Sequence, residues 1–112
     1  MRTLVILRSL ALFVAAGLCE ISGGWLMWKW LRDHKSGWWG LVGALILIVY
    51  GIVPTFQASH FGRVYAAYGG FFIVLSLAWG WGLDGNRPDP ADVCGAAIAL
   101  LGVCVMYYWP RG

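Results

Sequence analysis

Charged residues are scarce in this sequence of 112 residues, because only 12% of its side chains are Asp, Glu, Lys or Arg, whereas 61% are hydrophobic. The mean hydropathy is +0.73. In soluble globular domains roughly 25% of the residues are charged, so the composition excludes an ordinary soluble domain. It indicates an integral membrane protein that is surrounded by lipid.

Cysteine is also scarce, and its placement excludes further classes of protein. The three cysteines, Cys19, Cys94 and Cys104, lie in apolar stretches without a C-x-x-C pair. This pattern argues against a disulfide framework and against a zinc site. The histidines, His34 and His60, have no metal-ligand spacing to each other or to cysteine, and no nucleophile motif is present. We therefore expect no metal, no cofactor and no enzymatic activity.

Four apolar stretches are long enough to cross a bilayer as helices, which requires about 20 residues each. The predicted helices cover residues 4–30, 37–56, 59–83 and 90–109. Pro54 is expected to end or kink the second helix. Asp89 followed by Pro90 is typical of the N-cap and first residue of a helix. The sequence thus predicts an all-α membrane protein with a single four-helix transmembrane domain over residues 1–112.

Glu20 is the one acidic residue away from the ends of these apolar spans. It lies roughly 18 Å of helix beyond Arg8 and roughly 13 Å before Lys29, at about 1.5 Å per residue. This places Glu20 near the middle of a hydrocarbon core about 30 Å thick, where an acid costs about 2.5 to 3.5 kcal/mol or more. An acid retained at that cost indicates a functional site. The alternative is a structural glutamate that is protonated and hydrogen-bonded.

A polar and aromatic segment lies early in the third span. At helical spacing Tyr65, Tyr68, Gly69 and Phe72 fall on one face, which presents two phenol rings beside a residue without a side chain. Aromatic faces attract organic cations, and each phenol can donate a hydrogen bond to a carboxylate. We therefore predict that this face binds a cation. The alternative is that the tyrosines are packing or interfacial residues.

The basic residues are divided equally between the two ends of the predicted bundle. One end has Arg2, Arg8, Arg63 and Arg111, and the other has Lys29, Arg32, Lys35 and Arg87. The positive-inside rule then gives no preferred orientation, which suggests insertion in both orientations. The alternative is a fixed topology that the translocation machinery sets. The net charge of +3 fits anionic lipid headgroups, and without a basic stripe we expect no nucleic-acid partner.

Four helices that merely span the membrane leave none to enclose a water-filled path around Glu20, so we expect a homodimer. One stripe of the fourth helix would allow a second subunit to approach closely. It consists of Gly95, Ala99 and Gly102, which follow one another at i, i+4 and i+7.

These motifs resemble those of the YnfA family, a group of bacterial inner-membrane proteins related to the small multidrug resistance exporters. The matching segments are Leu18-Cys19-Glu20-Ile21, the run from Gly62 to Gly70, and Asp92 with Gly95 to Gly102. The resemblance covers essentially the whole chain. It implies four-helix subunits, antiparallel dual-topology homodimers and proton-coupled export of cationic or toxic organic compounds.

The resemblance also implies roles for single residues. In the small multidrug exporters the third-helix pattern is Tyr-Ala-x-Trp-Ser-Gly. Tyr65 matches its tyrosine, Tyr68 replaces its tryptophan, and Gly69 replaces its serine. Glu20 matches the single membrane glutamate on which coupling depends. Arg63 is a YnfA-type feature that either extends to the lipid headgroups or pairs with Glu20 in one state.

The sequence therefore predicts a proton-coupled antiporter of small organic cations in the bacterial inner membrane. Two Glu20 side chains, one from each subunit, are expected to face a shared cavity and to exchange protons for a substrate cation, with H⁺ as the coupling ion. Two other functions remain open at this point. One is a small structural or regulatory membrane subunit in which Glu20 binds a basic residue of a partner helix. The other is a channel without proton coupling.

Overall fold

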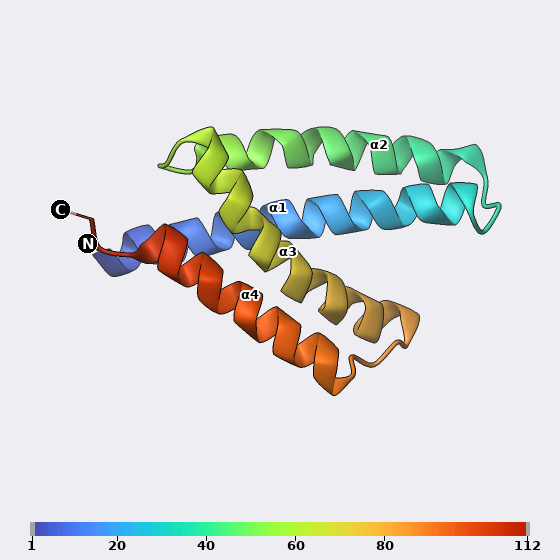
Figure 1. Ribbon diagram of the computed structural model, residues 1–112. Coiled ribbons are helices and arrows are strands. Elements are labelled where there is room, and N and C mark those ends of the chain that lie inside the picture. Colours follow the sequence, from blue (N-terminus) through green and yellow to red (C-terminus); the bar gives the residue numbers. More distant parts are fainter. Residues whose placement is uncertain (1, 112) are drawn as a thin grey trace.

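The computed structural model describes residues 2–111 and contains four long helices joined by short connections (Figure 1). They are α1 (Arg2–Leu31), α2 (Gly37–Ile52), α3 (Phe61–Asp84) and α4 (Pro90–Tyr108), and the short 3₁₀ helix η1 (Val53–Phe56) extends α2. Met1 and Gly112, the two ends of the predicted domain, lie outside the described residues. Each helix, with α2 taken together with η1, is long and apolar enough to cross a membrane. The chain is therefore an all-α, multi-pass membrane protein, as the sequence predicts.

Two predictions that rest on proline are confirmed: Pro54 lies where the α-helix of the second span ends, and Pro90 is the first residue of the fourth helix. The α-helix of the second span ends at Ile52 and tightens into η1, where Pro54 has no N–H to donate. At the start of α4 the Asp89 side chain accepts a hydrogen bond from the Asp92 N–H at 2.7 Å. The Asp92 side chain in turn accepts from the Asp89 N–H at 3.1 Å, which completes a capping box before the helix.

The third helix begins two residues later than the predicted start at Ser59. Its first residue is Phe61, because His60 has an extended backbone and its side chain accepts a hydrogen bond from the Arg63 N–H at 3.3 Å. At its other end Gly85 adopts a left-handed conformation with φ of 73° and caps α3, as a residue without a Cβ does readily.

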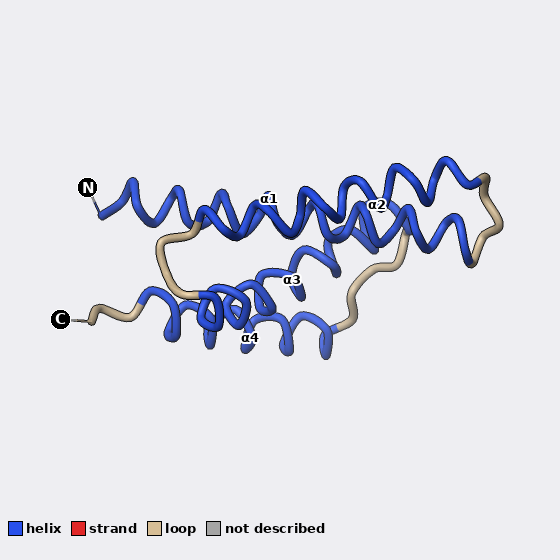
Figure 2. Tube along the Cα trace, turned by 90° about the horizontal axis from the view of Figure 1, so that it is seen from above, coloured by secondary structure: helices blue, strands red, loops and turns tan. Residues whose placement is uncertain are grey.

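The helices form two antiparallel hairpins, α1 with α2 and α3 with α4, and α3 crosses α1 obliquely (Figures 1 and 2). Both termini and the connection 57–60 lie at one end of the molecule, which we call the termini end. The connections 32–36 and 85–89 lie at the other, the connection end. In the view of Figure 1 the hairpins are close at the termini end and farther apart at the connection end.

Glycines allow the helices of each hairpin to approach closely. A Cβ added at Gly43 in α2 would lie 2.8 Å from the Gly23 carbonyl oxygen in α1. One added at Gly70 in α3 would overlap the Val103 side chain and lie 3.2 Å from the Ala99 carbonyl oxygen in α4. Small residues at membrane helix contacts permit this backbone packing.

The tightest packing lies toward the termini end. Phe13 in α1 is 1% exposed and stacks on Phe71 in α3 with ring centroids 4.8 Å apart. The edge of Tyr107 from α4 meets the same Phe13 ring at 5.0 Å. One side chain of α1 thus contacts both helices of the second hairpin. The space that remains between the hairpins lies farther toward the connection end.

Candidate functional site

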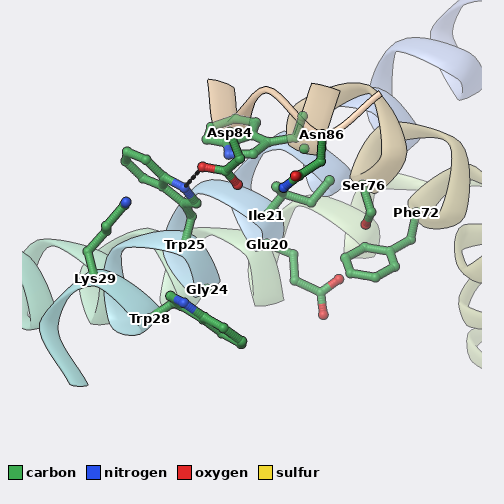
Figure 3. A pocket seen from close by; sticks show the side chains of 12 residues that line it. Glu20, Ile21, Gly24, Trp25, Trp28, Lys29, Phe72, Ser76, Asp84 and Asn86 are labelled. Carbon is green, nitrogen blue, oxygen red and sulfur yellow. Dashed lines mark hydrogen bonds between the residues drawn. The ribbon is translucent and has the colours of Figure 1, made fainter. Parts of the chain in front are cut away.

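A cavity of about 730 Å³ lies between α1 and α3 and extends toward the connection end (Figure 3). Its walls consist of residues from the C-terminal half of α1, from α3 and from the connection that follows α3. The lining residues are Glu20, Ile21, Gly24, Trp25, Trp28, Lys29, Phe72, Ser76, Trp79, Gly80, Asp84 and Asn86. A volume of this size is typical of sites for small organic ligands, and an apolar wall with a few polar groups is typical of them too.

Glu20 lies where the cavity adjoins the packed part of the bundle. Its carboxylate is partly buried, and the Tyr68 hydroxyl donates a hydrogen bond to Oε2 at 2.5 Å. Tyr68 is 5% exposed, and its ring lies 5.5 Å from that of Tyr50 and 5.9 Å from that of Phe72. A phenol from α3 therefore holds the α1 carboxylate, as the sequence suggested a phenol could. Packing on both sides fixes the position of that phenol.

The cavity walls are two helical stripes that face each other. On α1, Gly24 and Trp28 follow Glu20 at i+4 and i+8, which places the three on one face. On α3, Ser76 and Trp79 follow Phe72 at i+4 and i+7. Gly24 has no side chain, so the space above it stays open between the carboxylate and the tryptophans.

Aromatic and charged groups surround the mouth of the cavity at the connection end. The Trp25 indole N–H donates to Asp84 Oδ1 at 3.1 Å, a bond that links α1 to the end of α3 (Figure 3). The Trp25 and Trp79 ring centroids are 6.0 Å apart. Lys29 Nζ lies 5.0 Å from the Trp25 ring centroid and 3.1 Å from Asp33 Oδ2. Lys29 thus lines the mouth, and its charge is paired with Asp33, which lies outside the cavity lining.

The aromatic face that the sequence predicts on α3 is divided between two places. Tyr68 points to Glu20, and Phe72 lines the same cavity. Tyr65 instead contacts Phe61, with ring centroids 4.4 Å apart and the rings tilted by 36°, and lines a second cavity of about 380 Å³ beside η1. Gly69 is exposed, and a Cβ added there would meet no atom within 4 Å. The roles of Tyr65 and Gly69 in cation binding stay predictions.

Arg63 lies in the first turn of α3, at the termini end and away from the cavity. Among residues 2–111 the one ion pair within 4.0 Å joins Lys29 to Asp33, so Arg63 is not paired with Glu20 in this structure. Its position at the helix end is the one from which a long side chain reaches the headgroups.

The predicted stripe on α4 is mostly open. A Cβ at Gly95 or Gly102 would meet nothing within 4 Å, whereas the carbonyl of Ala99 packs toward Gly70. The neighbouring Ile98 and Leu101 are 71% and 67% exposed. This face of α4 is left for lipid or another subunit, and its role in a dimer stays a prediction.

Most residues of the cavity were not singled out as site residues from the sequence, among them Trp28, Ser76 and Trp79. The signal that could have found them is the helical spacing from Glu20 and from Phe72. Ser76 Oγ and Trp79 Nε1 are buried and have no hydrogen-bond partner among residues 2–111. Buried polar atoms usually have a partner, so these two are available to a group inside the cavity.

The chain matches the family model described as "Uncharacterised BCR, YnfA/UPF0060 family" over residues 6–112. Similar curated proteins carry the name UPF0060 membrane protein. YfjF of Bacillus subtilis is 59% identical over 109 residues, which is 96% of this chain and 100% of that protein. A protein of Synechocystis is 60% identical over 107 residues, 96% of this chain and 99% of its own length. One from Herpetosiphon aurantiacus is 55% identical over 108 residues, with 95% and 98% covered. No solved structure matches the chain.

Proposed function

This chain belongs to the YnfA/UPF0060 family of membrane proteins, and we propose that it exports small organic cations in exchange for protons across the bacterial inner membrane. Glu20 is the group that binds proton and substrate in turn. The observation that supports this most strongly is the position of its carboxylate, at the inner end of an aromatic-walled cavity of about 730 Å³. No cofactor other than the coupling proton takes part, and no covalent step occurs.

The exchange follows from competition for one carboxylate. An ionised carboxylate attracts an organic cation, and the aromatic rings around it add to that attraction. A proton on the same group removes its charge and so releases the cation. Because the two ligands exclude each other, a proton gradient drives cation movement if only occupied states change orientation.

The contacts of Glu20 favour this function over that of a structural subunit. In the structural-subunit alternative a basic residue from another protein neutralises the acid in the membrane. Within this chain Glu20 already accepts a hydrogen bond from Tyr68 and faces an open cavity. The Glu20 carboxylate is therefore hydrogen-bonded within the chain and also accessible from the cavity, as reversible binding of a cation requires.

We also propose that the working unit is an antiparallel homodimer in which both copies contribute Glu20 to the transport path. The exposed α4 face with Gly95 and Gly102 would serve as the contact surface. C-terminal reporters should then be found on both sides of the inner membrane. A reporter confined to one side would contradict dual insertion but leave the exchange chemistry untouched.

The decisive experiment is uptake of ethidium, a planar organic cation, into liposomes that contain purified protein. With an imposed pH gradient the wild type should accumulate ethidium, and Glu20→Gln should not, because the amide keeps the shape of the side chain but cannot exchange a proton. Glu20→Asp should retain coupling with an altered pH profile. Asp92→Asn is the matched control, since it removes an acid outside the cavity and its amide oxygen can still accept the capping bond.

Each contrary result identifies another function. Proton-driven uptake by Glu20→Gln would return Glu20 to a structural role. Uptake that ignores the pH gradient in the wild type would indicate a channel. Purified wild type that binds and transports no cation would favour a subunit that needs a partner.

A further inference from the structure

The cavity has a second negative group at its mouth, in addition to Glu20 at its inner end. Asp84 lines the same cavity and is held by the Trp25 indole at 3.1 Å. In Figure 3 the Asp84 carboxylate lies beside Trp25, above and away from the Glu20 carboxylate. Trp25 follows Glu20 by five residues on α1, so the two carboxylates are separated by a distance on the order of 10 Å.

The end of α3 concentrates negative charge at this mouth. A helix C-terminus carries a partial negative charge and is normally accompanied by basic side chains. The last turn of α3 contains no basic residue, and the helix ends on an acid, Asp84. Among residues 2–111 no Lys or Arg nitrogen lies within 4.0 Å of Asp84, and the ammonium of Lys29, which also lines the mouth, lies 3.1 Å from Asp33 Oδ2. A cation bound at the mouth would offset the charge of Asp84 and the partial negative charge at the end of α3.

Tryptophan rings line the cavity between the two carboxylates. Trp25, Trp28 and Trp79 line the cavity between the Glu20 level and the mouth. These rings already attract cations within the chain, since Arg32 lies 4.7 Å from the centroid of Trp28 and Lys29 lies 5.0 Å from that of Trp25. An apolar chain or ring that connects two cationic groups fits walls of this kind.

We propose that the cavity selects organic dications, which place one cationic group at Glu20 and the other at Asp84. This inference rests on the proposed cation site at Glu20 and adds Asp84 as a specificity-determining residue. A monocation fills the Glu20 subsite alone. A dication whose charges match the length of the cavity fills both and is bound more tightly.

Calorimetric titration of the purified protein tests this with bis-quaternary ions of increasing length: pentamethonium, hexamethonium and decamethonium. Each is compared with the alkyltrimethylammonium ion of the same chain length, which differs by one charged group. For the best-matched length the wild type should bind the dication roughly fivefold more tightly, the upper end of what an exposed ion pair contributes. Asp84→Asn should reduce that preference to less than twofold and leave the monocation affinity unchanged.

Two variants sharpen the result. Asp84→Glu keeps a carboxylate at the mouth and should keep the preference, with the best length displaced. Asp92→Asn removes an equal charge at the same end of the molecule but outside the cavity, so its preference should match that of the wild type.

The outcomes separate this inference from the proposed function. If the monocations bind through Glu20 but no dication binds more tightly, or if Asp84→Asn weakens both classes alike, the second subsite is overturned and the exchange function stands. If neither class binds to the wild type, the cation site at Glu20 is wrong, and the inference that depends on it is overturned as well.

Discussion

The two ends of this molecule use different aromatic residues. All five tyrosines lie in the half nearer the termini, whereas seven of the eight tryptophans lie in the half nearer the connections. The tyrosines are Tyr50, Tyr65, Tyr68, Tyr107 and Tyr108. The seven tryptophans are Trp25, Trp28, Trp30, Trp38, Trp39, Trp79 and Trp81. Basic residues, by contrast, are divided equally between the two ends.

The tyrosine hydroxyls hold helices together. Tyr108 shares a hydrogen bond with Ser9 at 3.0 Å, and Tyr107 donates to Gln57 at 3.3 Å. Tyr68 donates to Glu20. A phenol both donates and accepts, so it can join a partner of either kind. The termini end is thus packed by rings and closed by polar bonds between segments far apart in the sequence.

Three of the tryptophans, Trp25, Trp28 and Trp79, instead line the cavity. An indole only donates, and it offers a larger ring face than a phenol. Trp25 makes a bond across the mouth to Asp84, while the buried Trp79 N–H has no partner among residues 2–111. We call the termini end, with its tyrosines, the tyrosine end, and the connection end, with its tryptophans, the tryptophan end. In an antiparallel dimer the tyrosine end of one subunit would lie beside the tryptophan end of the other. The membrane would then meet one closed and one open end on each side.

The largest effect is expected when the tyrosine end loses its central ring. Phe13→Ala removes a side chain that is 1% exposed and contacts both Phe71 and Tyr107. We expect the free energy of unfolding in detergent micelles to fall by about 3 kcal/mol, the lower end for a core phenylalanine, because in lipid only the packing is lost. Thermal or SDS-induced unfolding followed by circular dichroism measures the change.

Phe56→Ala is the matched control, since Phe56 lies at the same end but is 56% exposed. Its unfolding free energy should change by less than about 0.5 kcal/mol. Equal losses in the two variants would show that the contact of Phe13 with the second hairpin does not stabilise the closed end.

Much of the fold could be predicted from the sequence because the membrane limits the choices. Apolar length defines the four helices, and the Asp89-Pro90 signal defines the start of α4 to the residue. Glu20 could be identified because an acid in a long apolar stretch is costly. The start of α3 was less accurate, since the cap at His60 depends on a side-chain geometry that the sequence pattern does not show.

The candidate site could be predicted only in part. Helical spacing places Tyr65 and Tyr68 on one face, but it does not show how α3 crosses α1. That crossing brings Tyr68 to Glu20 and leaves Tyr65 beside η1. The tryptophans of the cavity look like interfacial residues in the sequence, because a residue near the end of a span can face lipid, headgroups or a cavity. Only the packing of the hairpins decides between these.

An intermediate effect is expected when the one tyrosine bond to the cavity is removed. Tyr68→Phe deletes the hydroxyl that donates a hydrogen bond to the Glu20 carboxylate, a bond of the kind that contributes about 1.5 to 3 kcal/mol. Without this bond the carboxylate that receives the cation is no longer held in place by the phenol. Ethidium affinity, measured by titration at one pH, should therefore fall about tenfold, which corresponds to about 1.4 kcal/mol.

Tyr108→Phe is the matched control for this variant. It also removes one phenolic hydroxyl at the termini end, but that group pairs with Ser9 and not with the cavity. Its ethidium affinity should match that of the wild type. A loss of the same size in both variants would mean that Tyr68 acts through general packing of the tyrosine end.

The smallest effect is expected at the tryptophan end, and it tests whether these rings bind cations. Trp28 lines the cavity, and the guanidinium of Arg32 lies 4.7 Å from its ring centroid, which shows that a cation can approach this ring. Trp28→Ala should weaken ethidium binding by about 1 kcal/mol, the size of a partly exposed cation–π contact. Trp81→Ala, at the same end but outside the cavity lining, should leave the affinity unchanged.

Tyr65→Ala should weaken ethidium binding less than Trp28→Ala does, because Tyr65 borders the cavity beside η1. The sequence alone predicts the reverse order, with Tyr65 in the cation platform. A larger loss in Tyr65→Ala than in Trp28→Ala would therefore place the cation at the tyrosine end and refute the assignment of the two ends.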